Sequence, residues 1–317
     1  MHIIADPKKS NQRLDKFLVD FALGKKEFEN FSRGDFIRAI KDGFVKVNGE
    51  ISRPSYKVNS VDNIEINIPE KSEKIISNPK IKLDVIFEND NFLIINKPAG
   101  IQIHPDFNEK ENTIVNGLIA HYPQIAKLES NEIFSFQQRP GIVHRLDKET
   151  SGVLIIAKNK KTFLEFKKMF QEKTVHKKYL ALVHGVPKEK ESIIEKPLAR
   201  TTNYRKQTIA GKKTKTKIRP AITHYKVLEK FKNNFSLIEA SPKTGRTHQI
   251  RVHLSSIGHP IIGDKLYSKK IYQPFEKASR HMLHAHEIEF NLFGEKFHFT
   301  APIPNDFQKI IKEIKNA

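Results

Sequence analysis

One short segment carries the strongest candidate for chemistry in this chain. Residues 141–159 read GIVHRLDKETSGVLIIAKN, an apolar stretch, a polar turn and a second apolar stretch. Asp147 lies at the end of the first stretch, beside Arg145. Because loops held by rigid strands often present reactive side chains, Asp147 is a candidate nucleophile or general base. In the other interpretation, Asp147 and Thr150 only cap a hairpin turn, and the spacing alone favours that turn.

A second segment, residues 241–268, offers a cation that can act with such a carboxylate. It predicts a helix on which Ile250, Leu254 and Ile257 form one apolar face. Arg251 lies at the border of that face. It either reaches inward to pair with a buried carboxylate or stays solvated with a packed stem. Composition alone favours the solvated side chain.

Two further segments add an aromatic ring and a lysine. Residues 176–185, HKKYLALVHG, predict a strand with Tyr179 and Ala181 on one face. Tyr179 is therefore a core aromatic with a satisfied hydroxyl or a ring that stacks on a base. Residues 96–105, NKPAGIQIHP, predict a strand end and a Pro-Gly turn. The Lys97 side chain at this strand end either lies near a phosphate or braces the sheet.

Together, these segments resemble the successive signatures of the RluA-type RNA pseudouridine synthases. HRLDKETSG matches the family pattern HRLD-x-x-TSG at every fixed position. NKPAGIQIHP, KKYLALVHG and GRTHQIRVHLSSIGHPIIGD accompany it, and the resemblance spans residues 81–302. Four signatures in one chain are far more specific than one short motif. Two departures, Ser268 after the GDKLY run and an unusual loop at residues 129–137, leave the signature residues intact.

The resemblance implies roles for four residues. Asp147 would be the essential catalytic aspartate, and Arg251 would pair with it. Tyr179 would lie against the target uracil and help to remove the proton from carbon 5. Arg145 would contact the RNA and fill the gap left by the flipped nucleotide. The isomerisation would break the bond between uracil and ribose and rejoin the base through carbon 5, with no cofactor.

The chemical route of Asp147 stays open at this point. An ionised aspartate can attack the base, attack the anomeric carbon or remove a proton from the ribose. The resemblance implies an α+β pseudouridine synthase fold with a mixed, mostly antiparallel sheet.

Two other functions share some of these residues. His281, His284 and His286 form HMLHAH, a spacing at which neutral imidazoles can bind zinc. No carboxylate partner is evident beside them, so we expect no metal site and disfavour a metal hydrolase. A non-catalytic RNA-binding or ribosome-assembly protein would use the same basic segments. It would not need the three candidate catalytic residues together.

The charge of the chain points to a polyanionic partner. Its 317 residues include 56 Lys and Arg against 36 Asp and Glu, a formal net charge of +20. Nearly all of the excess lies beyond residue 70, and residues 196–219 hold nine basic and no acidic side chains. Such blocks favour nucleic acid, and the resemblance implies that this nucleic acid is RNA. The candidate RNA contacts are Arg33, Arg38, Lys41, Lys97, Arg145, Arg205, Lys206, Lys212, Lys213 and Arg246.

The composition also excludes several classes of protein. The chain has no cysteine, which rules out disulfides, Cys-zinc sites, iron–sulfur clusters and thiol nucleophiles. No apolar run approaches the ~18 residues of a transmembrane helix, and the start shows no signal-peptide pattern. We expect a cytoplasmic monomer that does not bind membranes.

These residues need a framework, and the sequence pattern predicts two domains. Residues 1–70 predict a small α/β domain with helices after Asn11 and Ser32, a stop at Gly43, strands at 44–47 and 64–68, and an Asn48-Gly49 turn. SRGDFIRAIKDGFVKVNGE resembles the small RNA-binding domain first described in the small-subunit ribosomal protein numbered four. Residues 71–80 predict a linker, and residues 81–317 predict the catalytic domain.

The second domain predicts many strands and few helices. Strands are predicted at 83–87, 92–96, 142–145, 153–157, 178–183, 223–228, 236–240 and 286–290. Helices are predicted at 113–121, 161–171, 247–256 and 304–314. This interleaving is typical of an α+β fold.

The substrate is predicted from the resemblance alone. NGLIAHYP and RPGIVHRLDK are most similar to the branch that modifies large-subunit ribosomal RNA. We therefore favour that RNA, with tRNA as the alternative.

Overall fold

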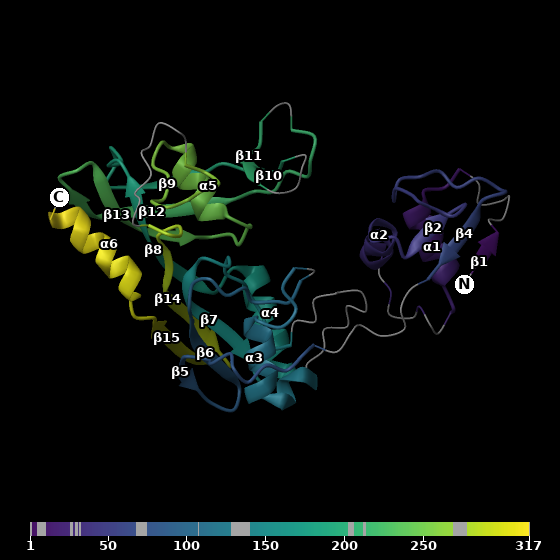
Figure 1. The fold of residues 1–317 in the computed structure, drawn as a ribbon, viewed down its shortest axis with the longest axis horizontal. Coiled ribbons are helices and arrows are strands. Elements are labelled where there is room, and N and C mark those ends of the chain that lie inside the picture. Colours follow the sequence, from purple (N-terminus) through teal and green to yellow (C-terminus); the bar gives the residue numbers. More distant parts are fainter. Residues whose placement is uncertain are drawn as a thin grey trace.

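The chain forms two units, each with its own sheet and core (Figure 1). The computed structural model describes residues 2–4, 11–25, 28, 31, 33–67, 75–106, 108–127, 140–201, 206–211, 214–268 and 278–316. The fold is α+β, with a small antiparallel sheet first and a large mixed sheet after it. Within the described ranges, no helix is both long and apolar enough to cross a membrane.

The first unit places two helices against a four-stranded antiparallel sheet. Its elements are β1 (His2–Ile4), α1 (Leu14–Ala22), α2 (Arg33–Lys41), β2 (Val45–Val47), β3 (Glu50–Ile51) and β4 (Asn63–Ile66), with strand order β1-β4-β2-β3. The helices and the sheet share one core around Leu18, Phe36 and Ile64. Asn48 and Gly49 both have positive φ, as a type I′ hairpin turn requires.

One predicted helix cap is wrong and one lies outside the described residues. Asn11 takes a left-handed φ of 68° and lies ahead of the helix. Arg13 occupies the N-cap position of α1 without a side-chain cap. Ser32 is not among the described residues.

The second unit is built on a nine-stranded sheet. Its strands are β5 (Val85–Glu88), β6 (Phe92–Lys97), β7 (Ser151–Ala157), β8 (His176–His184), β9 (Glu191–Glu195), β12 (Ile222–Phe231), β13 (Phe235–Pro242), β14 (Leu283–Leu292) and β15 (Glu295–Thr300). The order is β5-β6-β7-β14-β8-β13-β12-β9, with β15 paired to β14. β7 and β14 pair in parallel, and the other strand pairs described are antiparallel. The predicted mixed, mostly antiparallel sheet is confirmed.

The helices cover this sheet and explain its apolar strands. They are α3 (Ile114–His121), a 3₁₀ helix at Pro123–Lys127, α4 (Lys160–Glu172), α5 (Gln249–Ser256) and α6 (Asn305–Asn316). Successive residues of β6 enter different cores, Phe92 and Ile94 in one, Leu93 and Ile95 in the other. A strand buried on both faces reads as a continuous apolar run, which accounts for the run FLII. A separate hairpin joins β10 (Leu198–Arg200) to β11 (Gln207–Ile209).

Two sequence predictions need correction here. The predicted strand at residues 142–145 is wrong, since only Ile142 forms a bridge, to Ile156. The Nε2 atom of His144 accepts the Ile155 N–H at 2.8 Å, so a side chain takes the place of a strand partner. Part of the predicted linker also belongs to the second unit. The Asn116 side-chain amide of α3 donates to the Ile76 carbonyl at 2.7 Å, so contacts of this unit begin before residue 81.

Candidate active site

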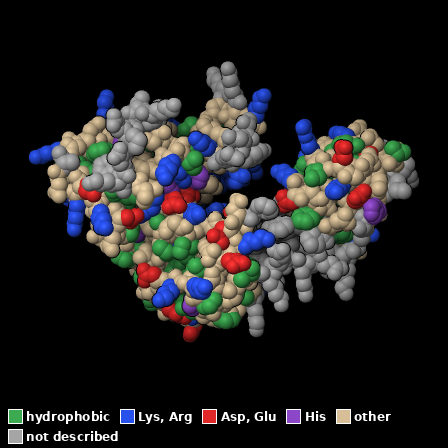
Figure 2. Space-filling view, viewed as in Figure 1, with side chains coloured by type: hydrophobic (Ala, Val, Ile, Leu, Met, Phe, Trp, Pro, Cys, Tyr) green, Lys and Arg blue, Asp and Glu red, His purple; other side chains and the backbone are tan. Residues whose placement is uncertain are grey.

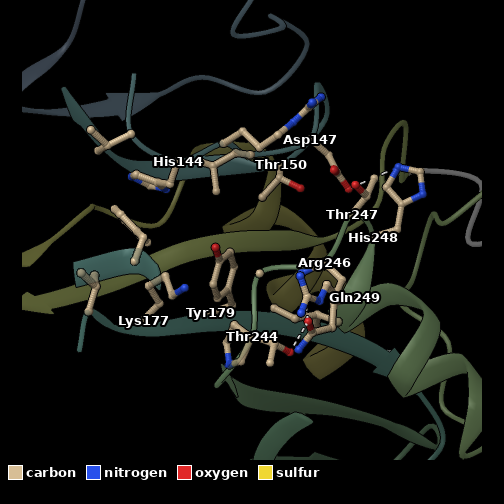
Figure 3. Close-up of a pocket in the computed structure, with 18 of the residues that line it drawn as sticks. His144, Asp147, Thr150, Lys177, Tyr179, Thr244, Arg246, Thr247, His248 and Gln249 are labelled. Carbon is tan, nitrogen blue, oxygen red and sulfur yellow. Dashed lines mark hydrogen bonds and ion pairs between the residues drawn. The ribbon is translucent and has the colours of Figure 1, made fainter. Parts of the chain in front are cut away.

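A cavity of about 530 Å³ opens beside the loop that precedes β7 (Figure 3). Asp147 comes from this loop, Tyr179 from β8 and Arg251 from α5. The structure therefore brings all three predicted catalytic residues to one cavity, although they are far apart in the sequence.

The loop around Asp147 is a turn in which the Asp147 carboxylate does not cap the backbone. The Thr150 N–H donates to the Asp147 backbone carbonyl at 3.0 Å, so the predicted turn exists. The Asp147 side chain takes no part in it and points to α5. Gly152 has a φ of 113°, and a Cβ there would overlap the Ala285 carbonyl of β14. Glycine is thus required for the close approach of β7 and β14 behind the loop.

Arg251 joins Asp147 to a second carboxylate. Its Nη1 atom donates to Asp147 Oδ2 at 2.9 Å. Its Nε and Nη2 atoms donate to the two oxygens of Asp264 at 2.7 and 3.0 Å. The Asp264 side chain is fully buried, and that of Asp147 is 20% exposed. Of the two readings of Arg251, the inward one is therefore correct, and the fork geometry of the pair fixes its orientation.

Asp264 was not singled out from the sequence. Burial raises the pKa of its carboxyl, but the hydrogen bonds and the positive charge of Arg251 outweigh burial, so the pKa lies below its usual value. The signal that was available is the GD pair that closes the fourth signature. An ionised Asp264 anchors Arg251 from behind, which leaves one end of the guanidinium for Asp147.

His248 is a second residue that the sequence did not reveal. Tyr267 accepts the Gln207 N–H at 2.9 Å, and its hydroxyl lies 2.8 Å from His248 Nδ1. Burial lowers the pKa of His248, which favours the neutral ring. Its Nε2 atom lies 3.8 Å from Asp147 Oδ2.

Tyr179 offers an aromatic ring to the cavity. Burial, and then the negative charge of Asp147, raise the pKa of its hydroxyl, so the phenol keeps its proton. Its hydroxyl makes no hydrogen bond to any residue that the structure describes. Near it, His144 stacks on Phe170 with ring centroids 5.0 Å apart. Burial, and then the positive charge of Lys177, lower the pKa of His144 to about 3, so the imidazole itself is uncharged.

Lys97 corrects a sequence prediction. Its side chain is fully buried, and its Nζ atom donates to the carbonyls of Pro98, Ile101 and Lys148 at 2.7, 2.8 and 3.0 Å. All three donors of the ammonium are thereby used. Of the two interpretations of Lys97, the structural brace is therefore correct and the phosphate contact is wrong. Through the Lys148 carbonyl, Lys97 holds the loop that carries Asp147.

Three residues of β14 and the segment before it support this loop from the other side. Arg280 Nη1 donates to the Glu149 carbonyl at 3.0 Å, and its Nε atom donates to Asp306 of α6 at 2.6 Å. His281 Nε2 lies 2.8 Å from the Thr150 hydroxyl. His284 Nδ1 lies 2.9 Å from the Ser151 hydroxyl.

The same contacts bear on the histidine cluster considered for zinc. His284 uses both ring nitrogens, on the Ser151 hydroxyl and the Ala301 carbonyl, and His286 Nδ1 also faces Ala301. No group of three or more His, Asp or Glu side chains suited to a metal ion occurs among the residues described.

Acid should weaken the structure through His281 and His284. Burial lowers the pKa of each to about 4, whereas the unfolded chain binds the proton near pH 6.5. The unfolded state therefore holds more protons between pH 6.5 and 4, so the free energy of unfolding falls as the pH falls through this window. Between pH 7.5 and 5.0 we expect a loss of about 2 kcal/mol from each histidine.

Urea unfolding at the two pH values measures this loss. His281→Gln keeps a partner for Thr150 and should reduce the loss by about 2 kcal/mol, while the exposed His298→Gln serves as the control. An equal loss in all three proteins would contradict a role for buried histidines.

The other predicted RNA contacts lie in different places. Arg145 and Arg246 line the cavity, and Arg246 Nε also donates to the Pro220 carbonyl at 3.1 Å. Lys206 is exposed beside β11. In the first unit Lys41 is exposed, whereas Arg33 pairs with the fully buried Asp15 at 2.9 Å. The remaining predictions, Arg205, Lys212, Lys213 and the side chain of Arg38, fall outside the described residues.

The cavity is strongly cationic. Its described lining includes Arg145, Lys167, Lys173, Lys177, Lys243, Arg246 and Arg251, and Asp147 is the carboxylate among them. Figure 2 shows Lys and Arg side chains around the hollow of the larger unit. One aspartate in a cationic cavity of a size typical for small ligands suits an enzyme that acts on a polyanion such as nucleic acid.

Comparison with known proteins gives the family. The family profile described as RNA pseudouridylate synthase matches residues 91–256. A Bacillus subtilis protein named as the uncharacterized RNA pseudouridine synthase YlyB is 34% identical over 99% of this chain and 97% of its own length. The chain belongs to the RluA family of RNA pseudouridine synthases, isomerases that act on RNA.

Other relatives carry more specific names. The ribosomal large subunit pseudouridine synthase D of Haemophilus influenzae is 30% identical over 98% of this chain and 93% of its own. That of Neisseria meningitidis is 34% identical over 96% and 79%. Among solved structures, human RNA Pseudouridylate Synthase Domain Containing 1 superimposes with a TM-score of 0.55 at 25% identity, over 74% of this chain and 96% of that chain. The pseudouridine synthase fold expected from the four signatures is confirmed.

Proposed function

We propose that this synthase isomerises uridines in large-subunit ribosomal RNA. The observation that carries the proposal is the pair of relatives named for the large ribosomal subunit, which match 96% or more of this chain. Such a match includes the first unit as well as the cavity. The first unit, residues 1–70, then acts as a separate RNA-binding domain that directs the enzyme to this RNA.

Asp147 is the catalytic carboxylate in this proposal. A uridine cannot react inside a base stack, so the target nucleotide is flipped into the cavity at a cost of a few kcal/mol. The bond from ribose carbon 1 to uracil N1 breaks, and a new bond forms from carbon 1 to uracil carbon 5. The proton on carbon 5 leaves and N1 gains one, so the product is an isomer and no cofactor is consumed.

The surrounding residues have positioning and binding roles. Arg251 holds the Asp147 carboxylate toward the cavity through the 2.9 Å contact. Tyr179 lies against the uracil with its ring and is placed to help move the proton of carbon 5. Arg145, exposed at the rim, contacts the RNA and fills the space that the flipped nucleotide leaves.

The substrate class can be tested by tritium release from RNA labelled at carbon 5 of uridine. We expect release from unmodified large-subunit ribosomal RNA and little from tRNA transcripts. Binding should weaken steeply with salt, because each neutralised phosphate releases counterions. Faster release from tRNA than from ribosomal RNA would favour the tRNA alternative. If no tritium is released from ribosomal RNA, from tRNA or from ribosomal particles, a non-catalytic RNA-binding protein would be the better account.

A further inference from the structure

A second cavity of about 410 Å³ adjoins the first. Five residues line both cavities, namely Lys173, Val175, Lys177, Pro242 and Lys243. The two cavities are therefore adjacent, and these residues form the boundary between them, which we call the neck. A volume of this size lies within the ~300–1,000 Å³ typical of small-ligand sites.

Three lysines of the neck have no anionic partner. Within the described part of the chain, Lys173, Lys177 and Lys243 form no side-chain hydrogen bond or ion pair. The Nζ atom of Lys177 lies 5.4 Å from the centroid of the Phe170 ring. Lys177 precedes Tyr179 by two residues on β8, so both side chains face the first cavity (Figure 3). The neck thus presents unpaired positive charge next to the ring proposed to contact the uracil.

The far wall of the second cavity carries carboxylates that are already paired with basic side chains. Glu287 pairs with Lys178 at 3.0 Å and lies 3.3 Å from His298. Glu289 pairs with Lys296 at 3.1 Å. Because these charges largely match one another, the wall offers no unpaired cation for a second phosphate among its described residues, while its carboxylate oxygens can still accept a hydrogen bond from the amino group of a base. A neutral base therefore suits the second cavity, whereas a phosphate suits the neck.

We propose that the neck lysines bind the phosphate between the target uridine and one neighbouring nucleotide, and that the second cavity receives the neighbour's base. Lysine is a compact charge well suited to a phosphate. With the target base against Tyr179 in the first cavity, the connecting phosphate of the strand falls at the neck. This inference rests on the proposed function only in requiring a uridine within an RNA strand.

The test uses short RNAs that contain a mapped target uridine. In one RNA all linkages are phosphates, and in two others a neutral methylphosphonate replaces the linkage on the 5′ or the 3′ side of the target. The full chain and its Lys177→Met and Lys243→Met variants are compared by tritium release and by binding at several salt concentrations. Lys309→Met is the matched control, since Lys309 is exposed on α6 and lines neither cavity.

Each neck variant should lower kcat/KM on the all-phosphate RNA by about 10–100-fold, the range for a lost hydrogen bond to a charged group. The slope of log K against log salt should fall by about 0.7. One methylphosphonate, on one side only, should impose the same loss on the wild type and abolish the effect of each lysine variant. Lys309→Met should match the wild type throughout.

If the loss in kcat/KM from a lysine variant multiplies with the loss from each of the two methylphosphonates, lysine and phosphate act independently and the proposal is overturned. Unchanged slopes of log K against log salt would also overturn it. Because Lys243 is exposed, its variant keeps the test valid if Lys177→Met does not fold. If the wild type fails on every all-phosphate RNA, the proposed function has failed instead. An RNA whose neighbouring nucleotide lacks its base tests the second cavity. If this RNA reacts with unchanged kcat/KM, the second cavity does not bind the neighbour's base.

Discussion

Asp147→Asn should abolish isomerisation and leave RNA binding nearly unchanged. Asparagine has almost the same volume and can still accept from Arg251, but it can neither attack the substrate nor take up a proton. Loss of the reacting group should lower kcat by at least about 10³-fold. Because Asp147 is the carboxylate of an otherwise cationic lining, removing its charge should not weaken binding of a polyanion. Tritium release measures the first effect, and titration with labelled RNA measures the second.

A matched control comes from an acidic residue of an exposed ion pair. Glu229 pairs with Lys315 at 2.9 Å and does not line the cavity, so Glu229→Gln should behave as the wild type. If Asp147→Asn retains activity within tenfold of the wild type, another residue is the catalytic group.

Arg251→Met should both inactivate and destabilise the enzyme. Methionine preserves much of the volume but leaves the fully buried Asp264 without its cation. Breaking a buried pair on one side typically costs about 3–5 kcal/mol, because an uncompensated charge remains. Urea unfolding should show this loss, and tritium release should fall because Asp147 loses the contact that orients it.

The double variant Arg251→Met/Asp264→Asn separates the two effects. It leaves no unpaired charge buried at this position, so we expect most of the lost stability to return. The double-mutant cycle should then give a large coupling energy between Arg251 and Asp264. Activity should not return, because Asp147 remains unsupported. A destabilisation by Arg251→Met below about 1 kcal/mol would place this pair in the range of exposed ion pairs and contradict its structural role.

The sequence predicted which three candidate catalytic residues would share a cavity better than it predicted the residues around them. Asp147, Tyr179 and Arg251 lie in motifs and meet in the cavity. Asp264 and His248 were missed because their importance comes from tertiary contacts to Arg251 and Asp147, which spacing does not encode. Lys97 was wrongly given to RNA, since full burial of a lysine is rare. Its position at a strand end gave no sign of the three carbonyls around it.

The errors in the predicted strands can also be traced to particular residues. The hairpin of β14 and β15 turns at Phe293 and Gly294, which both have positive φ. This sequence lacks the Asn-Gly or Asp-Gly pair by which such turns are recognised, so β15 was not predicted. The false strand before Asp147 arose because its apolar run resembles a strand, whereas His144 occupies the neighbouring edge of β7.

The hydrogen-bonded chain from Gln207 through Tyr267 to His248 joins the hairpin to the surroundings of Asp147. Gln207 belongs to the hairpin strand β11, and the Tyr267 hydroxyl both accepts from its backbone N–H and lies 2.8 Å from the imidazole. Displacement of the hairpin would therefore break the contacts that hold the His248 ring 3.8 Å from Asp147. The setting of the carboxylate inside the cavity thus depends on a strand that does not line the cavity.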